Sequence, residues 1–186
     1  MHIARNLCLS LLATIILAST SFAEAGTMTL GELIKFSDCI VIGRVVNARV
    51  DGKRIAELEV TQVLKGDPSW KRVRFYAFPF WACDISDARE NERGLFFLTS
   101  DPVGDPKEKV PVEKDSDGIA IFFITHSGRG RMIFERTEGQ DYVYAYKGGE
   151  VKFPGSLKYA RYPRADDRKL GLIRADDVLS YIRKRL

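Results

Sequence analysis

The sequence has few of the residues that most often bind metals or act as nucleophiles: two histidines and three cysteines among 186 residues. His2 and Cys8 lie in the first apolar segment, so only Cys39, Cys83 and His126 remain for a folded domain. A zinc site needs about four ligands, and these three residues are far apart in the chain. The segment EKDSDG at 113–118 lacks the glutamate that closes a calcium loop. The sequence therefore predicts neither a metal site nor a cofactor.

Long apolar runs are also missing beyond the first two dozen residues, where no segment approaches the ~20 residues of a membrane-spanning helix. At the start, Arg5 precedes an apolar run from Leu7 to Ala18, and Ser21-Phe22-Ala23 has the small-x-small pattern of a cleavage site. Cys8 is not preceded by a lipobox. These features predict a signal peptide over residues 1–23 and a periplasmic or secreted domain over residues 24–186.

No charge of one sign dominates the chain. Loss of Arg5 with the signal peptide would leave 28 basic and 25 acidic residues, a net charge of +3. Such a mild excess indicates solubility and does not identify a partner. Tyrosines and arginines alternate in the basic segment 158–169, which in a cytoplasmic barrel would suggest single-stranded nucleic acid. Export makes an anionic envelope polymer or an unknown protein the better candidate partner, with no nucleic acid expected, and a solvated face is the simpler alternative.

The apolar pattern predicts many short strands and a short helix at each end. Thr29 and Glu32 have the spacing of a capping box, which predicts a helix over residues 30–36. Asp176 or Asp177 is expected to cap the last helix, with Val178, Ile182 and Leu186 as its apolar stripe. The predicted strands, in chain order, cover 39–50, 54–66, 72–78, 94–100 and 119–125, followed by shorter ones near 132–136, 142–146 and 150–153.

In the strand over 54–66, Ala56, Leu58, Val60, Gln62 and Leu64 are expected on one side. No strand–helix–strand alternation is present, so the pattern favours a small antiparallel barrel or sandwich over a doubly wound sheet.

Four segments resemble the netrin-like domain, the OB-type barrel of tissue inhibitors of metalloproteinases and related secreted modules. They read FSDCIVIGRVVNARV, AELEVTQVLKGDPSWKRVRF, WACDIS and RGLFFLT. The elements that match are Ser37-Asp38, Ile40 to Val46, Val60 to Gly66, Cys83, and Phe96 to Leu98. The resemblance implies a mainly β, OB-like barrel core over about residues 29–100, with a C-terminal extension over about 119–186.

The metalloproteinase inhibitors coordinate the target zinc through an N-terminal cysteine, and this chain has no cysteine near Glu24 or Gly26. That mechanism is therefore not carried over. Cys83 matches the family's cysteine position, whereas Cys39 stands where the family has an apolar residue. An exported chain with two cysteines favours one disulfide, Cys39–Cys83. Its loop of about 45 residues would contribute roughly 3–4 kcal/mol on the chain-entropy model.

Two further groups of residues are candidates for catalysis or ligand binding. Cys83 with His126 would be the nucleophile and base of a cysteine hydrolase, although no nucleophile motif surrounds Cys83. In the segment HSGRGRM at 126–132, Arg129 lies between two glycines and Arg131 follows the second, so both are expected to project charge from a turn between strands. With His126 they are candidate contacts for an anion or other ligand. A solvated hairpin tip is the alternative.

The expected function is a non-enzymatic binding or inhibitory module of the cell envelope or extracellular space. The alternatives are the Cys-His hydrolase and a purely structural envelope protein.

Overall fold

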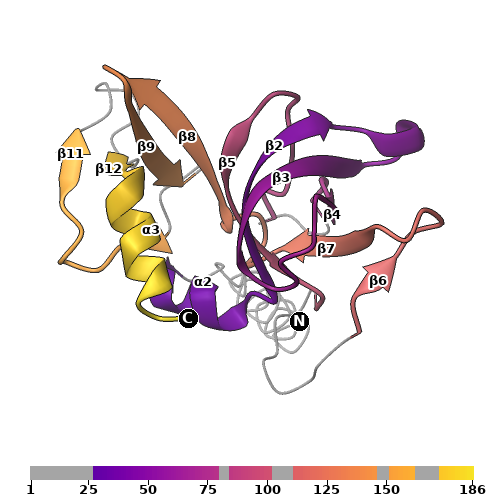
Figure 1. Ribbon diagram of the computed structural model, residues 1–186, viewed down its shortest axis with the longest axis horizontal. Helices are drawn as coiled ribbons and strands as arrows, with labels where there is room; N and C mark the ends of the chain where they lie inside the picture. Colours follow the sequence, from indigo (N-terminus) through magenta and orange to yellow (C-terminus); the bar gives the residue numbers. More distant parts are fainter. Residues whose placement is uncertain (1–26, 80–83, 102–110, 146–150, 162–171) are drawn as a thin grey trace, which may run out of the picture.

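The computed structural model describes residues 27–79, 84–101, 111–145, 151–161 and 172–186. The expected signal peptide, Cys83 and most of the basic segment 158–169 lie outside these ranges. Within them, no helix is long and apolar enough to cross a membrane. Strands dominate the structure, with a short helix near the N-terminal end of the described chain and another at the C-terminus (Figure 1).

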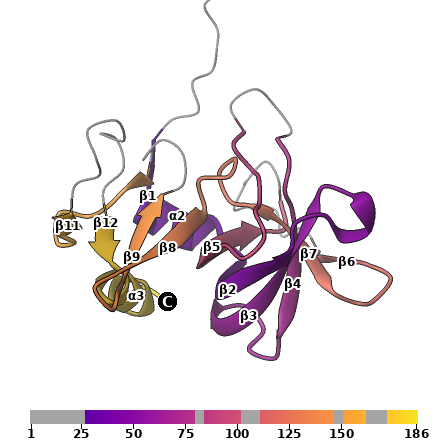
Figure 2. The same ribbon diagram turned by 90° about the horizontal axis from the view of Figure 1, so that it is seen from above.

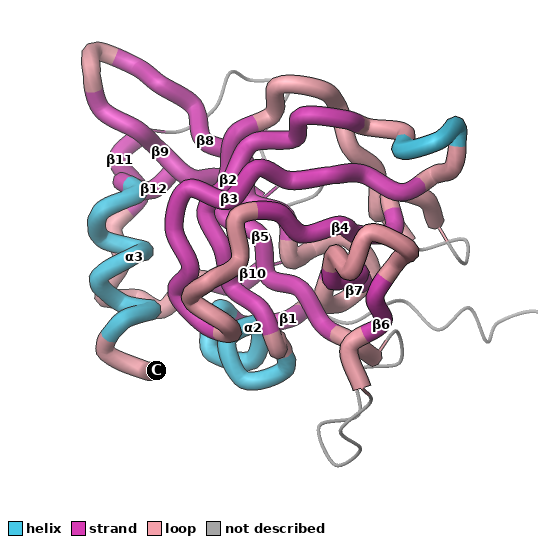
Figure 3. The backbone as a smooth tube through the Cα atoms, turned by 45° about the vertical axis from the view of Figure 1, so that its right-hand side comes forward, coloured by secondary structure: helices cyan, strands magenta, loops and turns pink. Residues whose placement is uncertain are grey.

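Five strands form a closed barrel, as the resemblance predicts (Figure 3). They are β2 (Cys39–Asn47), β3 (Ile55–Lys65), β4 (Arg72–Tyr76), β5 (Arg93–Thr99) and β7 (Ala120–Ile124). β2 pairs antiparallel with β3 and β5, and β3 pairs antiparallel with β4. β4 then pairs parallel with β7, and antiparallel pairing between β5 and β7 closes the ring. The short strand β6 (Glu113–Lys114) extends from β7.

The C-terminal strands extend the sheet away from the barrel (Figure 2). β8 (Arg131–Thr137) pairs with β5, and it is followed in the sheet by β9 (Gln140–Ala145), β12 (Leu172–Arg174) and β11 (Tyr159–Arg161). The helix α3 (Ala175–Arg183) packs beside β9 and β12. Near the N-terminus, β1 (Met28–Thr29) pairs in parallel with β10 (Val151–Lys152), and α2 (Leu30–Phe36) follows. The predicted C-terminal extension of strands and a helix is therefore confirmed.

Two apolar cores share the wall formed by β2 and β5. The barrel interior contains Cys39, Val41, Val45, Ala56, Leu58, Val73, Phe75, Phe96, Leu98, Ala120, Phe122 and Ile124. The second core lies between the barrel, the C-terminal sheet and both helices, and it contains Leu30, Leu33, Ile34, Ile40, Ile42, Leu95, Phe97, Met132, Val143, Val151, Leu157, Ile173, Ala175, Val178 and Ile182. Successive residues of a strand point to opposite faces, so β2 and β5 supply both cores. The first half of β2 is therefore buried on both faces.

The helix α2 begins as the sequence predicts. The Thr29 hydroxyl oxygen accepts a hydrogen bond of 3.1 Å from the Glu32 backbone N–H, and the Thr29 N–H donates to Glu32 Oε2 at 2.8 Å. The Thr29 hydroxyl also donates to Glu32 Oε2, at 2.8 Å. The Thr29 N–H and hydroxyl together lower the pKa of the Glu32 carboxyl, because they stabilise its charged form. The apolar side of the helix, with Leu30, Leu33 and Ile34, is buried in the second core.

In the strand over 54–66, the side chains do not alternate regularly between the two faces along the whole length. Register shifts lie at Thr61 and Leu64, where β3 has one more residue than β2. Each bulge reverses the side to which later residues point. Val63 therefore packs against the barrel core, whereas Leu64 packs against the second core. Placing Gln62 and Leu64 on the same side as Val60 was wrong for this reason.

Two further predictions are corrected. The first strand ends at Asn47, because a turn with left-handed φ at Asp51 (51°) and Gly52 (70°) follows in Val50–Gly52. The last helix has no side-chain cap, since its N-cap residue is Arg174 and both aspartates lie within the first turn. Its apolar stripe is buried at Val178 and Ile182, while Leu186 is 53 % exposed.

Gly94→Ala should destabilise the protein by about 1–3 kcal/mol, the usual range for overpacking. A Cβ at position 94 would overlap the Met132 carbonyl oxygen and lie 3.1 Å from Ile133 Cα, so β8 could not keep its place beside β5. Urea unfolding measures the change. Gly155→Ala is the matched control, because no atom lies within 4 Å of its Cβ position. Equal stability of the two variants would contradict the β5–β8 pairing.

Candidate functional site

The turn at 126–131, a candidate ligand site on sequence grounds, is packed into the structure. Arg129 is 5 % exposed and Arg131 is fully buried. The Arg131 guanidinium pairs with the Asp87 carboxylate and, at 3.3 Å, with Glu92. The prediction that both arginines project charge into solvent is therefore wrong, because the loop 84–92 covers the turn. Their contact with an external ligand, together with His126, stays a prediction.

The glycines of this turn allow the covering loop to approach. Gly128 has a φ of 87°, and a Cβ there would lie 2.5 Å from the Ser86 nitrogen. The Ile85 N–H donates to the Ser127 carbonyl at 3.0 Å, which joins loop and turn directly. The segment therefore fastens the loop 84–92 to β8, and its glycines allow this close backbone packing.

Cys39 lies inside the barrel, with its side chain completely buried. Its thiol is free in the structure. Burial, and to a smaller extent the charge of Asp38, raises the pKa of this thiol well above its ordinary value. Cys83 lies outside the described residues, so the Cys39–Cys83 disulfide and the Cys83–His126 pair both remain predictions.

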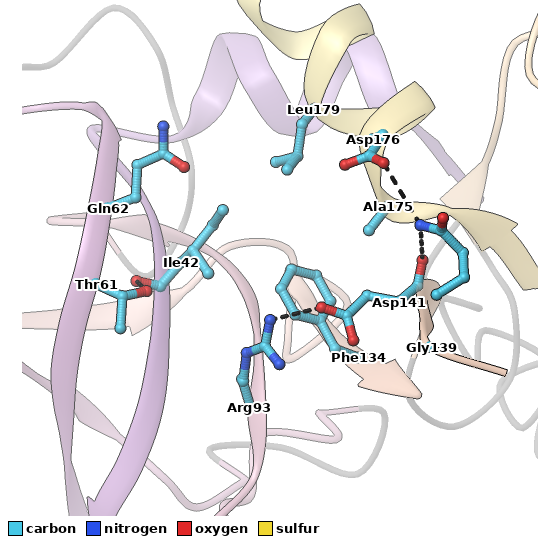
Figure 4. Close-up of a pocket in the computed structure, with 11 residues that line it drawn as sticks. Ile42, Thr61, Gln62, Arg93, Phe134, Gly139, Asp141, Ala175, Asp176 and Leu179 are labelled. Atoms are coloured by element: carbon cyan, nitrogen blue, oxygen red, sulfur yellow. Dashed lines mark hydrogen bonds and ion pairs between the residues drawn. The ribbon is translucent and has the colours of Figure 1, made fainter. Parts of the chain in front are cut away.

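A cleft of about 470 Å³ opens where the barrel, the β8–β9 hairpin and α3 meet (Figure 4). Its lining comes from six elements or turns: Ile42 of β2, Thr61 and Gln62 of β3, Arg93 of β5, Phe134 of β8, Gly139, Gln140 and Asp141 of the hairpin, and Ala175, Asp176 and Leu179 of α3. The cleft therefore exists only when the C-terminal extension is folded against the barrel.

The apolar part of the lining is the edge of the second core. Ile42 and Ala175 are buried members of that core, and Phe134 and Leu179 pack against it. In Figure 4, Leu179 and Ile42 extend toward the open space from α3 and from β2. The accessible surface of the cleft is nevertheless mostly polar, because these side chains are largely packed into the core.

An ion pair crosses one end of the cleft. The Arg93 guanidinium donates to Asp141 Oδ2 at 2.6 Å, and its carbon lies 5.3 Å from the centre of the Phe134 ring. Arg93 is 46 % exposed and Asp141 21 %. The second carboxylate oxygen, Asp141 Oδ1, is buried without a hydrogen-bond partner in the described part of the chain. Buried acceptors are nearly always hydrogen-bonded, so this oxygen is the unusual feature of the site.

Gln140 links the two acidic residues of the cleft. Its Nε2 donates to the Asp141 carbonyl at 3.3 Å and to Asp176 Oδ2 at 3.4 Å (Figure 4). Its amide oxygen accepts a hydrogen bond of 3.3 Å from Arg174. On the opposite wall, the Thr61 hydroxyl donates to the Ile42 carbonyl at 3.1 Å.

Sequence analysis did not identify this site. Of the lining residues it singled out Asp176, as a possible helix cap, and Gln62, as a member of a regular strand. The bulge at Thr61 and the docking of α3 against β9 bring these side chains together, and neither leaves a local pattern in the sequence. Among the residues that the structure describes, no cluster of three or more His, Cys, Asp or Glu able to hold a metal is found.

The chain matches no protein-family model, no curated protein and no solved structure. The netrin-like resemblance is therefore still based on the residues quoted above.

Arg131→Met should lower the free energy of unfolding by about 3 kcal/mol, because it leaves Asp87 and Glu92 without their buried partner. Chemical denaturation measures this. Arg136→Met on the exposed end of the same strand is the control and should cost less than about 0.5 kcal/mol. An Arg131 variant as stable as the control would show that the turn and loop 84–92 are held in some other way.

Cys39 should resist alkylation in the folded protein from about pH 7 to about pH 9, although an ordinary thiol with a pKa near 8.5 reacts faster over that range. The reason is its complete burial and raised pKa. Exported protein is treated with iodoacetamide in the native and in the unfolded state, each with and without reductant. The intact mass then reports how many thiols are labelled.

If the Cys39–Cys83 disulfide forms, the unfolded protein takes up no label until it is reduced. Uptake of two labels without reductant would rule the disulfide out. Rapid labelling of Cys39 in the native state would contradict its place inside the barrel.

Proposed function

We propose that this protein is an exported, non-enzymatic binding module that holds its ligand in the cleft between the barrel and the C-terminal extension. The observation that supports this best is the cleft itself. Its volume of about 470 Å³ falls within the roughly 300–1,000 Å³ typical of small-molecule sites. Its accessible lining is mostly polar, with Arg93, Asp141 and Asp176 as its charged groups.

The position of the cleft on the barrel supports the same conclusion. OB-type barrels bind ligands over the outer face of their second and third strands. Here the second barrel strand, β3, supplies Thr61 and Gln62 to the cleft wall. The netrin-like resemblance of residues 37–99 agrees with a secreted binding or inhibitory role, and the apolar segment at the start of the chain agrees with export.

The identity of the polar groups in the cleft, and the hydrogen bonds that they already form, favour binding over catalysis. The described lining contains no cysteine, histidine, serine or lysine. Its one hydroxyl, on Thr61, donates to a backbone carbonyl, and one oxygen of Asp141 is held by Arg93. The hydrolase alternative would use Cys83 with His126, and Cys83 lies outside the described residues.

The charges of the cleft do not favour an anionic polymer as the ligand. Its lining has one basic and two acidic side chains. The two arginines that suggested an anion site, Arg129 and Arg131, are buried elsewhere. A neutral or cationic ligand fits the described surface better.

Leu179→Trp should abolish ligand binding, because the larger ring fills the cleft from α3. The assay is a set of amide spectra of ¹⁵N-labelled protein, recorded with amines, amino acids, saccharides, nucleotides and carboxylates added separately. We expect at least one class to shift the amide signals of Gly139, Gln140 and Asp176.

Ser180→Trp is the matched control, since Ser180 is exposed on the same helix and does not line the cleft. It should bind as the unaltered protein does. Shifts remote from the cleft, or shifts that persist in Leu179→Trp, would contradict this location, and no shift with any class would contradict a small-ligand function.

A further inference from the structure

We propose that residues 113–118, which we call the strap, close over the outer face of β4 through their carboxylates and open while the barrel stays folded. Charge holds the strap in place, so it opens more often as salt is added. The strap begins with β6, at the end of the barrel farthest from α3 (Figures 1 and 2). The described lining of the cleft includes no residue of 113–118. The strap is therefore separate from the proposed binding site.

Three carboxylates of the strap reach side chains of β4. Asp115 pairs with the Arg74 guanidinium, and Asp117 lies 3.3 Å from the same group. Glu113 accepts a hydrogen bond of 3.0 Å from the Tyr76 hydroxyl. Hydrogen bonds between ionised groups are the strongest that side chains form. Charge therefore supplies the main contact between the strap and β4.

Arg74 keeps a partner when the strap opens. The Glu57 carboxylate of β3 lies 2.8 Å from its guanidinium, and only 11 % of the Arg74 side chain and 9 % of the Glu57 side chain are exposed. Burial lowers the pKa of the Arg74 guanidinium, but Glu57, Asp115 and Asp117 outweigh it and raise that pKa. The strap carboxylates thus repel Glu57 while they attract Arg74. Opening does not leave a buried charge unpaired, which is what usually makes such a contact costly to break.

The strap has little apolar anchorage. All its residues are exposed except Asp115, which is partly buried. In the described chain, no residue of 113–118 belongs to either apolar core or packs against one. Pairing with β7 is limited to the two residues of β6 and to the turn that follows. Segments with few buried apolar contacts open at a lower free energy than the folded core does.

Opening would change the chemistry of the outer face of β4. It would remove the strap carboxylates from Arg74 and Tyr76, beside the Phe123 ring, whose centre lies 4.7 Å from that of Tyr76. A carboxylate of another molecule could then reach the guanidinium. In the closed state the strap occupies this surface with groups of the same chemistry. The strap therefore controls access to the outer face of β4.

Backbone amide hydrogen exchange of the exported protein tests the strap. The Asp115 N–H donates to the Ile119 carbonyl at 3.1 Å, and the Ile119 N–H donates to Asp115 Oδ1 at 2.9 Å, so both report opening. The Phe97 N–H donates to the Gly130 carbonyl at 2.8 Å and reports the barrel. We expect protection factors at least about tenfold lower at Asp115 and Ile119 than at Phe97. Between about 0.05 M and about 0.5 M sodium chloride they should fall a few-fold further, with little change at Phe97.

Asp117→Asn tests the most exposed contact of the strap. It should lower the protection of Asp115 and Ile119 by a few-fold, because it removes a charge that attracts Arg74 from a side chain that is 63 % exposed. Asp177→Asn is the matched control. It removes the same charge from an exposed position of α3 and should leave this protection unchanged.

Arg74→Lys tests the other side of the contact. It should lower the protection of Ile119 by about tenfold or more, because one ammonium cannot bind the strap carboxylates while it pairs with Glu57. Arg72→Lys is the matched control, since Arg72 lies on the same strand, is 63 % exposed and pairs with Glu57 at 3.3 Å. Thermal unfolding shows whether each variant is folded, and the exposed Asp117→Asn keeps the test valid if Arg74→Lys is not.

Three results would overturn the inference. Protection at Asp115 and Ile119 equal to that at Phe97 would show that the strap opens only when the whole barrel unfolds. Protection that does not fall with salt would show that charge does not hold the strap. Equal loosening in Asp117→Asn and in Asp177→Asn would show that the effect is one of net charge and does not come from the contact with Arg74.

Discussion

The pairing of β2 with β5 is the interaction on which the rest of the structure depends. Residues opposite each other in this pair point to the same side, so Val41 and Phe96 enter the barrel while Ile42 and Leu95 enter the second core. Without the pair the barrel would be open and the C-terminal sheet would have no strand to join, because β8 extends from β5. Burial on both faces explains why this pair is rich in large apolar residues.

Buried charges hold the loops against this framework. Arg131 pairs with Asp87 and Glu92 to fasten the loop 84–92, and Arg74 joins Glu57 of β3 at 2.8 Å to Asp115 near β7. Replacing such pairs by apolar residues is often neutral, whereas removing one partner is costly. Each of these ion pairs therefore fixes the position of a segment, because apolar packing alone would not define where that segment lies.

The cleft follows from the same architecture. The second core narrows toward the surface between the barrel and α3, where polar residues of the β8–β9 hairpin replace apolar ones. The hairpin places Asp141 opposite Arg93, and α3 places Asp176 beside Gln140. A binding site at this junction would combine the rigidity of the barrel with chemistry supplied by the C-terminal extension, to which the netrin-like resemblance does not extend.

The sequence by itself determined the local elements: the helix over 30–36 from its Thr29 cap, most of the strands from their apolar alternation, and the mainly β fold. These depend on neighbours in the chain, so a local pattern is sufficient. It could not determine the side to which Leu64 points, the burial of Arg131 or the cleft, and it misjudged the first two. Bulges depend on the partner strand, and an arginine beside a glycine has the same local sequence whether or not a distant loop covers it. Only the tertiary structure decided these features, because each arises from residues dozens of positions apart whose contacts leave no periodic trace in the sequence.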